Sequence, residues 1–401
     1  MINNQEDILK RKSIKFNITN LLAFIFLVFL TSCFSYEATD SQFEKQTDSL
    51  QAMPESAKSD SIQNILRKVV NDGKAPGMIA AIISGEGIIA IASAGERKSG
   101  SGIKFTINDA VHLGSCTKSM TATMIATLVA EGKINWDTKL IEAIPELKNK
   151  IHVDYQSISL WQLLTHRAGL PKNAEDWDSH KQKEIKDRRL AILKDNLQEP
   201  SRHKKGEFNY SNLGYMIAAC MVEQLTGLSW EDLMKNRLFK PMGMSSTGFG
   251  APNTYNQTDQ PWGHSTSWFG NNWNPDQSDN SVALGPAGTV HCTIDDWAKF
   301  HSLWLKSENP ILEQKYLNKL IQPISNHYYA CGWGVMEQTW AKGKMLFHSG
   351  SNGIWASSVI VAPQVDRAFV VSTNSMDFDV TENLCKQILK TMVRMELNFN
   401  Q

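Results

Sequence analysis

The chain has 401 residues, of which 42% are hydrophobic, and its 41 Lys and Arg residues balance 41 Asp and Glu residues. This length corresponds to about two to three domains and can bury a large core. The apolar content excludes a disordered, collagen-like or small disulfide-stapled protein. Because a net charge of zero gives no general attraction to phosphate backbones, we expect no nucleic-acid partner and favour small-molecule or peptide chemistry.

The N-terminus has the pattern of an export signal. Four basic residues between positions 10 and 15 precede an apolar run over residues 21–30, which is shorter than the ~20 residues of a membrane-spanning helix. The run ends in Leu30-Thr31-Ser32-Cys33, which resembles the lipobox of bacterial lipoproteins; an ordinary signal anchor is the alternative. We therefore expect residues 1–32 to be removed as a signal peptide. Acylated Cys33 would then anchor the exported protein to a lipid membrane of the bacterial cell envelope, on the periplasmic or cell-surface side.

The pattern after the signal predicts an α+β fold. Polar, acidic residues over 33–60 indicate a solvated linker. Helical spacing of apolar residues follows at 62–70 and recurs near the end of the chain at 384–395. Between these helices the sequence predicts five short strands, which would form one antiparallel sheet flanked by the terminal helices. The predicted strands are 78–83, 88–92, 344–348, 355–362 and 367–373.

The predicted domains follow from this arrangement. Residues 61–114 and 286–398 would build the sheet domain, and residues 115–285, which are mainly helical in pattern, would form an inserted domain. Within the insertion, residues 251–281 are rich in Asn and Trp and lack periodicity, so we expect a long irregular loop that rims a site between the domains.

Ser115 and Lys118 are the first candidates for chemistry. They lie three residues apart at the start of a predicted helix and therefore share a face, which continues as Ala122, Ile125 and Val129. On an apolar face the lysine amine should be desolvated and its pKa lowered, as a base for the adjacent hydroxyl requires. The alternative is an N-capping serine beside a lysine whose stem covers apolar surface.

Two further segments carry candidate binding residues. Tyr210 and Asn212 precede a second helical stripe, and alternation in an extended segment would point both side chains the same way; a helix-capping Asn212 and a packed Tyr210 are the alternative. Strand residues His348-Ser349-Gly350-Ser351 end where Gly350 could let a ligand approach the backbone. The alternative for this segment is a histidine before a glycine turn.

Together the three segments resemble one family. Ser115-Cys116-Thr117-Lys118, Tyr210-Ser211-Asn212 and His348-Ser349-Gly350 are similar to the S-x-x-K, Y-x-N and K/H-x-G elements of the serine β-lactamase and penicillin-binding-protein family, in its class C β-lactamase, DD-peptidase and esterase branch. The likeness covers residues 62–395 and includes Leu163-Leu164-Thr165-His166-Arg167-Ala168-Gly169-Leu170.

The resemblance implies an acyl-serine route. Ser115 would attack a carbonyl, Lys118 and Tyr210 would handle its proton, and Asn212 would hold the substrate and Lys118. Backbone N–H groups of Ser115 and Ser351 would form the oxyanion hole. Which of Lys118 and Tyr210 is the base stays open, because the two groups would titrate as a coupled pair.

One departure shifts the expected substrate. Class C β-lactamases carry a lysine where this chain has His348, and a histidine is largely neutral at pH 7, so binding of β-lactams should weaken. We therefore expect a serine hydrolase that cleaves an ester or amide (peptide) bond without a metal or other cofactor. A β-lactamase or DD-carboxypeptidase is the alternative, and a non-catalytic wall-binding lipoprotein ranks last. The chain has no G-x-S-x-G elbow and no H-E-x-x-H motif, which disfavours an α/β-hydrolase and a metalloprotease.

Overall fold

The computed structural model describes residues 54–266, 273–324, 327–377 and 380–397. The predicted signal peptide, Cys33 and most of the predicted linker lie outside these ranges. The first helix, α2, spans Glu55–Asn71, so residues 55–60 are helical although the sequence analysis assigned them to the linker. Within the described ranges, no helix combines the length and apolar character needed to cross a bilayer.

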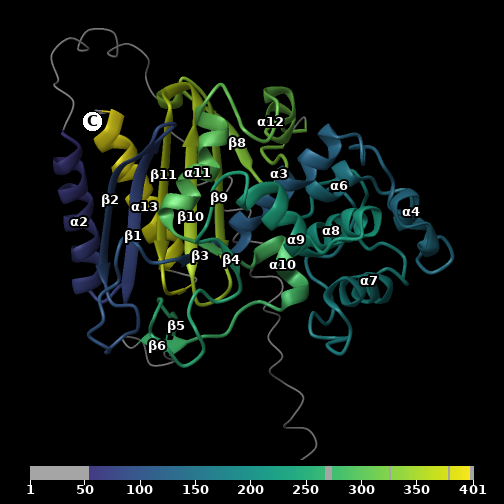
Figure 1. Cartoon of the computed structure of the whole chain (residues 1–401), viewed down its shortest axis with the longest axis horizontal. Coiled ribbons are helices and arrows are strands. Elements are labelled where there is room, and N and C mark those ends of the chain that lie inside the picture. The colour runs from purple at the N-terminus through teal and green to yellow at the C-terminus, as the bar shows by residue number, and fades with distance from the viewer. Residues whose placement is uncertain (1–53, 267–272, 325–326, 378–379, 398–401) are drawn as a thin grey trace, which may run out of the picture. The chain divides into compact units, whose positions relative to one another are not determined.

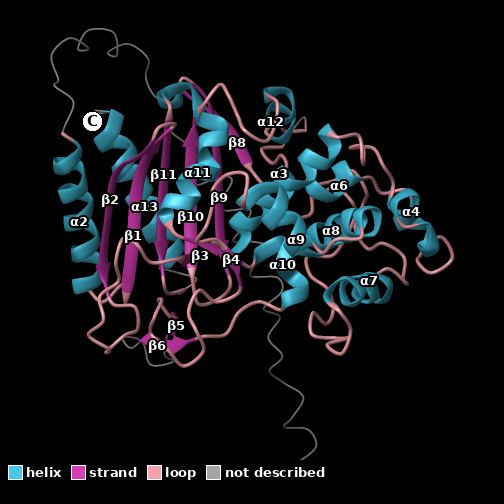
Figure 2. Cartoon of the chain, in the orientation of Figure 1, coloured by secondary structure: helices cyan, strands magenta, loops and turns pink. Residues whose placement is uncertain are grey.

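A single large antiparallel sheet organises the fold, in the order β2-β1-β11-β10-β9-β8 (Figure 2). All five predicted strands are present, and the structure adds a sixth, β8, at one edge of the sheet. The sequence analysis missed β8 because it is short and alternates little. The strands are β1 Gly77–Ser84, β2 Gly87–Gly95, β8 Gly334–Gln338, β9 Gly343–Ser351, β10 Ala356–Ala362 and β11 Arg367–Thr373.

Helices cover both faces of this sheet, which explains the nearly continuous apolar sequences of its central strands. α2 and α13 (Thr381–Leu397) contact the sheet and each other, and α11 (Ile294–Leu305) packs on it from the front in Figure 1. Glu396 of α13 joins α2 to β11, because it lies 2.6 Å from Lys58 of α2 and 2.6 Å from Arg367 of β11. The predicted α+β class is therefore confirmed.

The middle of the chain is mainly helical and is centred on α3 (Thr117–Ala130). Every residue from Thr117 to Leu128 is buried, so burial extends beyond the face of Lys118, Ala122 and Ile125 that was expected to be apolar, and α3 is covered by other helices. The division into two domains stays a prediction. The remaining helices are α4 Leu140–Ala143, α5 Val153–Gln156, α6 Leu160–Leu164, α7 Ile185–Asn196, α8 Asn212–Thr226, α9 Trp230–Met234, α10 Gly285–Gly288 and α12 Gln314–Leu320.

The segment expected to be an irregular loop carries local order. β5 (Gly263–Thr266) pairs with β6 (Trp273–Asp276) in a two-stranded sheet within residues 251–281. A separate three-stranded sheet, β3-β7-β4, lies next to the start of α3 and consists of Val111–His112, Val290–Cys292 and Gly248–Phe249. The sequence analysis missed these pairs because strands of two to four residues leave almost no periodic signal.

Candidate active site

Ser115 lies in a tight turn between the sheet and the central helix. The turn, Gly114–Cys116, is a short 3-10 helix directly before α3, so Ser115 precedes the α-helix rather than opening it. Ser115 is partly exposed, whereas its neighbours in the turn are buried. A hydroxyl in this position can meet a substrate while the backbone around it stays fixed.

Strand β9 packs directly against this turn. A Cβ atom on Gly350 would lie 2.1 Å from the carbonyl oxygen of Leu113 and 2.5 Å from the nitrogen of Ser115, and a Cβ atom on Gly114, whose φ is +49°, would lie 2.2 Å from the nitrogen of Ser351. Both positions therefore require glycine. The expected reason for Gly350 was a ligand approaching the backbone; the group that approaches is the protein's own Ser115 turn.

Lys118 lies beneath the serine, as its place in the sequence predicted. Its Nζ is 3.1 Å from Ser115 Oγ and 2.8 Å from the carbonyl oxygen of Ala287. The side chain is fully buried, and among the described residues no carboxylate pairs with it. Burial holds the pKa of Lys118 well below its usual value. A neutral amine can donate to Ala287 and accept the Ser115 proton.

Tyr210 reaches the same hydroxyl from another segment of the chain. It forms a hydrogen bond with Ser115, and the Lys118 Nζ lies 4.8 Å from the centre of its ring. Burial raises the pKa of Tyr210, although the Ser115 bond opposes this shift. Tyr210 and Lys118 therefore shift in opposite directions, which keeps the phenol protonated and the amine neutral.

His166 is a site residue to which the sequence analysis gave no role. It is buried with a φ of 59°, and its ring centre lies 4.4 Å from that of Tyr210 and 4.7 Å from that of Tyr329. Its Nδ1 accepts a hydrogen bond from the backbone N–H of Ser211 at 3.1 Å. Burial holds the pKa of His166 well below its usual value. A neutral His166 thus fixes the segment that carries Tyr210.

Asn212 is the first residue of α8, which Ser211 caps through a hydrogen bond from Gly214. The resemblance implied that Asn212 would hold Lys118. In the structure its amide donates to Asn173 Oδ1 at 2.7 Å, while Lys118 bonds Ser115 and Ala287.

His348 is buried and neutral. Its Nδ1 donates to the carbonyl of Ser349 at 2.7 Å, which leaves Nε2 to accept from the Tyr329 hydroxyl at 3.2 Å. Burial lowers the pKa of His348 to about 3. His348 therefore supplies no positive charge near pH 7.

The next residues of β9 bond within the protein. Ser349 Oγ lies 2.9 Å from Ser358 Oγ on β10, and Ser351 Oγ accepts from the N–H of Gly353 at 2.9 Å. Because both hydroxyls already have protein partners, the backbone of this strand is better placed than its side chains to contact a substrate.

A buried histidine and a carboxylate support the turn from behind. His112 Nδ1 accepts from the N–H of Gly114 at 3.1 Å, and its Nε2 lies 3.0 Å from Asp279 Oδ1. Asn352, which follows Ser351, donates to the same oxygen at 2.8 Å. Asp279 thus links the serine turn to the end of β9. No motif marks these residues, so sequence reasoning missed them.

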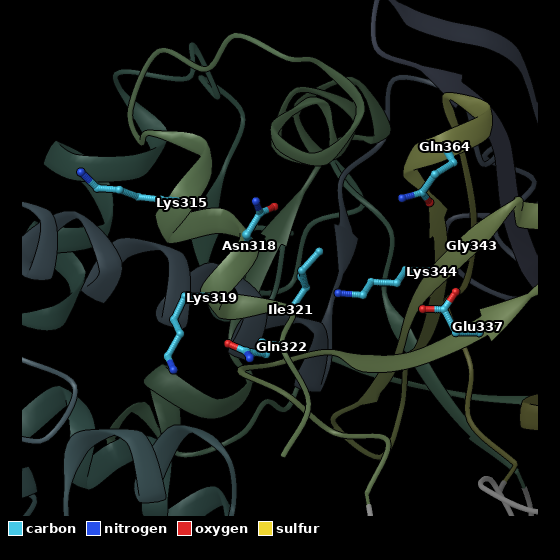
Figure 3. Close-up of a pocket in the computed structure, with 9 residues that line it drawn as sticks. All are labelled: Lys315, Asn318, Lys319, Ile321, Gln322, Glu337, Gly343, Lys344 and Gln364. Atoms are coloured by element: carbon cyan, nitrogen blue, oxygen red, sulfur yellow. The ribbon is translucent and has the colours of Figure 1, made fainter. Parts of the chain in front are cut away.

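The pocket drawn in Figure 3 is separate from these residues. It has a volume of about 560 Å³ and includes Gly343 and Lys344, at the end of β9 opposite to His348. Its lining holds Lys315 and Lys319 of α12 and Glu337 of β8, and it contains none of the predicted catalytic residues.

In the part of the chain that the structure describes, no three His, Cys, Asp or Glu side chains are arranged to hold a metal ion. The five cysteines of the described residues are free and buried: Cys116, Cys220, Cys292, Cys331 and Cys385.

The fold and the site define a serine hydrolase of the β-lactamase and amidase type. The β-lactamase family model matches residues 62–388, and the chain belongs to this family. Protein flp of Staphylococcus aureus (strain N315) is 24% identical over 321 residues, which cover 78% of this chain and 62% of flp. The chain thus matches less than two thirds of that relative's length.

Solved structures show the same fold. The octameric penicillin-binding protein homologue from Pyrococcus abyssi has a TM-score of 0.68 at 20% identity, over 85% of this chain and 79% of its own. The D-amino acid amidase from Ochrobactrum anthropi SV3, in complex with L-phenylalanine amide, has a TM-score of 0.67 at 22% identity, over 84% and 97%.

Proposed function

We propose that this protein is an envelope-anchored hydrolase that cleaves an ester or amide bond through an acyl intermediate on Ser115. The observation that carries the proposal is the 3.1 Å contact between Ser115 Oγ and the amine of Lys118, a lysine that is fully buried without a carboxylate partner among the described residues. Such an amine is neutral and can take a proton.

In the first step Lys118 acts as the base. The Ser115 O–H bond breaks, its proton moves to the lone pair of Nζ, and Oγ bonds to the substrate carbonyl carbon. The negative charge that forms on the carbonyl oxygen is stabilised by the backbone N–H groups of Ser115 and Ser351, from the turn and strand that are in direct contact. The opposite pKa shifts of Lys118 and Tyr210 favour the amine over the phenol as base.

In the second step the leaving group departs and water restores the enzyme. The proton on Lys118 passes to the leaving alcohol or amine, with Tyr210 as the relay because it bonds Ser115 and lies against Lys118. Lys118, now neutral again, takes a proton from the attacking water. The acyl–Oγ bond then breaks, an acid is released, and the proton returns to Ser115.

The neutral state of His348 bears on which substrates the enzyme prefers. Class C β-lactamases carry a lysine at the position of His348, and the neutral His348 provides no fixed charge at that position. We therefore place esters and amides of D-amino-acid type ahead of β-lactams, in keeping with the amidase among the proteins of similar fold. Hydrolysis of β-lactams or of peptidoglycan stem peptides is the second candidate.

Export and anchoring complete the proposal. They rest on the apolar run over residues 21–30 and the Cys33 that follows it. Metabolic labelling with a fatty-acid analogue tests this part: the wild-type protein should carry label in the membrane fraction, and Cys33→Ser should remove it.

Intact-mass analysis tests the chemistry. The protein is incubated with a short acyl ester, a penicillin and a fluorophosphonate probe, as wild type and as Ser115→Ala. The matched control is Ser119→Ala, which removes a buried hydroxyl from α3, one turn after Ser115; among the described residues this hydroxyl bonds the carbonyl of Cys116. We expect adducts on wild type and Ser119→Ala and none on Ser115→Ala; adducts that persist on Ser115→Ala contradict the assignment.

A further inference from the structure

Lys172 lies beside the proposed catalytic segment and is held there by its backbone. The chain from Leu170 to Lys172 runs along residues 209–212 and accepts three successive hydrogen bonds from them. Asn209 Nδ2 donates to Leu170 O at 2.6 Å, Ser211 Oγ donates to Pro171 O at 2.6 Å, and the N–H of Asn212 donates to Lys172 O at 2.7 Å. Lys172 therefore cannot leave the neighbourhood of Tyr210 and Asn212 without breaking these bonds.

The charge of Lys172 has no protein partner. Its side chain is partly buried, and it makes no ion pair or side-chain hydrogen bond with a described residue. Lys315, in contrast, is exposed and pairs with Glu313. Burial lowers the pKa of Lys172, and its charge helps to lower the pKa of Lys118. The ammonium costs free energy where it stands, because it is partly desolvated and has no counter-ion among the described residues.

The side-chain amides of Asn173 and Asn212, next to Lys172, can donate hydrogen bonds to an anionic ligand. Asn173, the next residue, and Asn212 form a pair of side-chain amides joined at 2.7 Å, whose remaining N–H groups are donors. His348 is neutral. Among these residues Lys172 is thus the one that can supply a full positive charge to a substrate.

We propose that Lys172, with the Asn173–Asn212 amide pair, binds a negatively charged group of the substrate, so that this enzyme prefers anionic esters or amides. The inference rests on the proposed acylation of Ser115 and adds a substrate class to it. A carboxylate bound there satisfies the ammonium by a charge-assisted hydrogen bond, which is stronger than a bond between neutral groups.

Matched ester pairs test this preference. One pair places the charge on the acyl side (p-nitrophenyl hydrogen succinate against p-nitrophenyl methyl succinate), and the other places it on the leaving group (4-carboxyphenyl acetate against its methyl ester). The quantity compared is kcat/KM for the anionic ester divided by kcat/KM for the neutral ester, at low and high salt. The proteins are wild type, Lys172→Met, Lys172→Arg and the control Lys315→Met.

For at least one pair, we expect the wild-type ratio to fall about tenfold in Lys172→Met, to be largely kept in Lys172→Arg, and to fall with salt. Lys315→Met should match wild type. A ratio that is equal in wild type and Lys172→Met for both pairs overturns the inference. Fluorophosphonate labelling of Ser115 distinguishes failure of the Lys172 site from failure of the proposed function. An enzyme that is labelled but shows no charge preference contradicts only the Lys172 site. An enzyme that is not labelled contradicts the proposed function as well.

Discussion

Replacing Lys118 with methionine should make the folded protein increasingly more stable than wild type as the pH falls below about 9.5. In the wild type the lysine is buried and neutral, whereas in the unfolded chain it is charged below its ordinary pKa of 10.5. Between the lowered pKa and 10.5 the unfolded state therefore binds more protons than the folded state. Wild-type stability must then fall as the pH falls through this window.

The size of the effect follows from proton linkage. Each pH unit in this window costs the wild type about 1.4 kcal/mol, and methionine carries no such cost. The variant loses the hydrogen bonds to Ser115 and Ala287, but this loss of about 1–3 kcal/mol does not depend on pH. The difference between the two free energies of unfolding should thus increase as the pH falls from 9.5 to 7.5, by up to about 1.4 kcal/mol for each pH unit that lies above the lowered pKa of Lys118.

Urea unfolding at half-unit steps from pH 7.5 to pH 9.5 measures this difference. The control is Lys133→Met, which removes an exposed lysine just after the same helix and should give a curve parallel to wild type. Lys118→Met should also lack acylation in the mass assay. Parallel curves for wild type and Lys118→Met would refute the neutral buried amine and, with it, the proposed base.

Three further outcomes follow from the geometry. His301 is fully buried, neither of its ring nitrogens has a partner among the described residues, and burial lowers its pKa to about 3. Between pH 6.5 and 3 the unfolded state binds a proton that the folded state does not, so the free energy of unfolding of His301→Leu, measured in urea, should rise relative to that of wild type by about 3 kcal/mol from pH 6.5 to pH 4. A difference that does not change with pH would contradict this. Asp279→Ala should lower kcat about tenfold with little change in KM for an ester, because Asp279 holds the turn through His112; a change confined to KM argues against positioning. Gly350→Ala should abolish Ser115 labelling, because its Cβ would lie 2.1 Å from the carbonyl oxygen of Leu113, and a labelled variant would show that the turn can move.

The candidate residues of the site were predictable where a short motif carries chemistry. Ser115 and Lys118 meet because three residues of helical turn bring their side chains together. Tyr210 was expected at the same site through the family resemblance, and it bonds Ser115. The partner of Asn212 was not predictable, because Asn173 comes from a loop 39 residues away that local pattern does not place.

The supporting residues were outside the reach of sequence patterns. Asp279 contacts His112 beside the serine turn, although the two residues lie 167 positions apart in the sequence. A lone carboxylate in a polar loop has the same local signal as any solvated aspartate. Likewise, the role of Gly350 depends on which backbone approaches it, and a sequence shows only that a glycine is there.

The amino-acid sequence alone determined the five main strands, the terminal helices, the α+β class and the Ser115–Lys118 pair, because periodicity and short spacing are local properties of the chain. The tertiary structure decided the protonation state of the site. Lys118 and His348 are neutral because distant segments bury them, and Lys172 keeps its charge unpaired because no described carboxylate reaches it. Desolvation depends on all the surrounding atoms, so it exists only once the chain has folded.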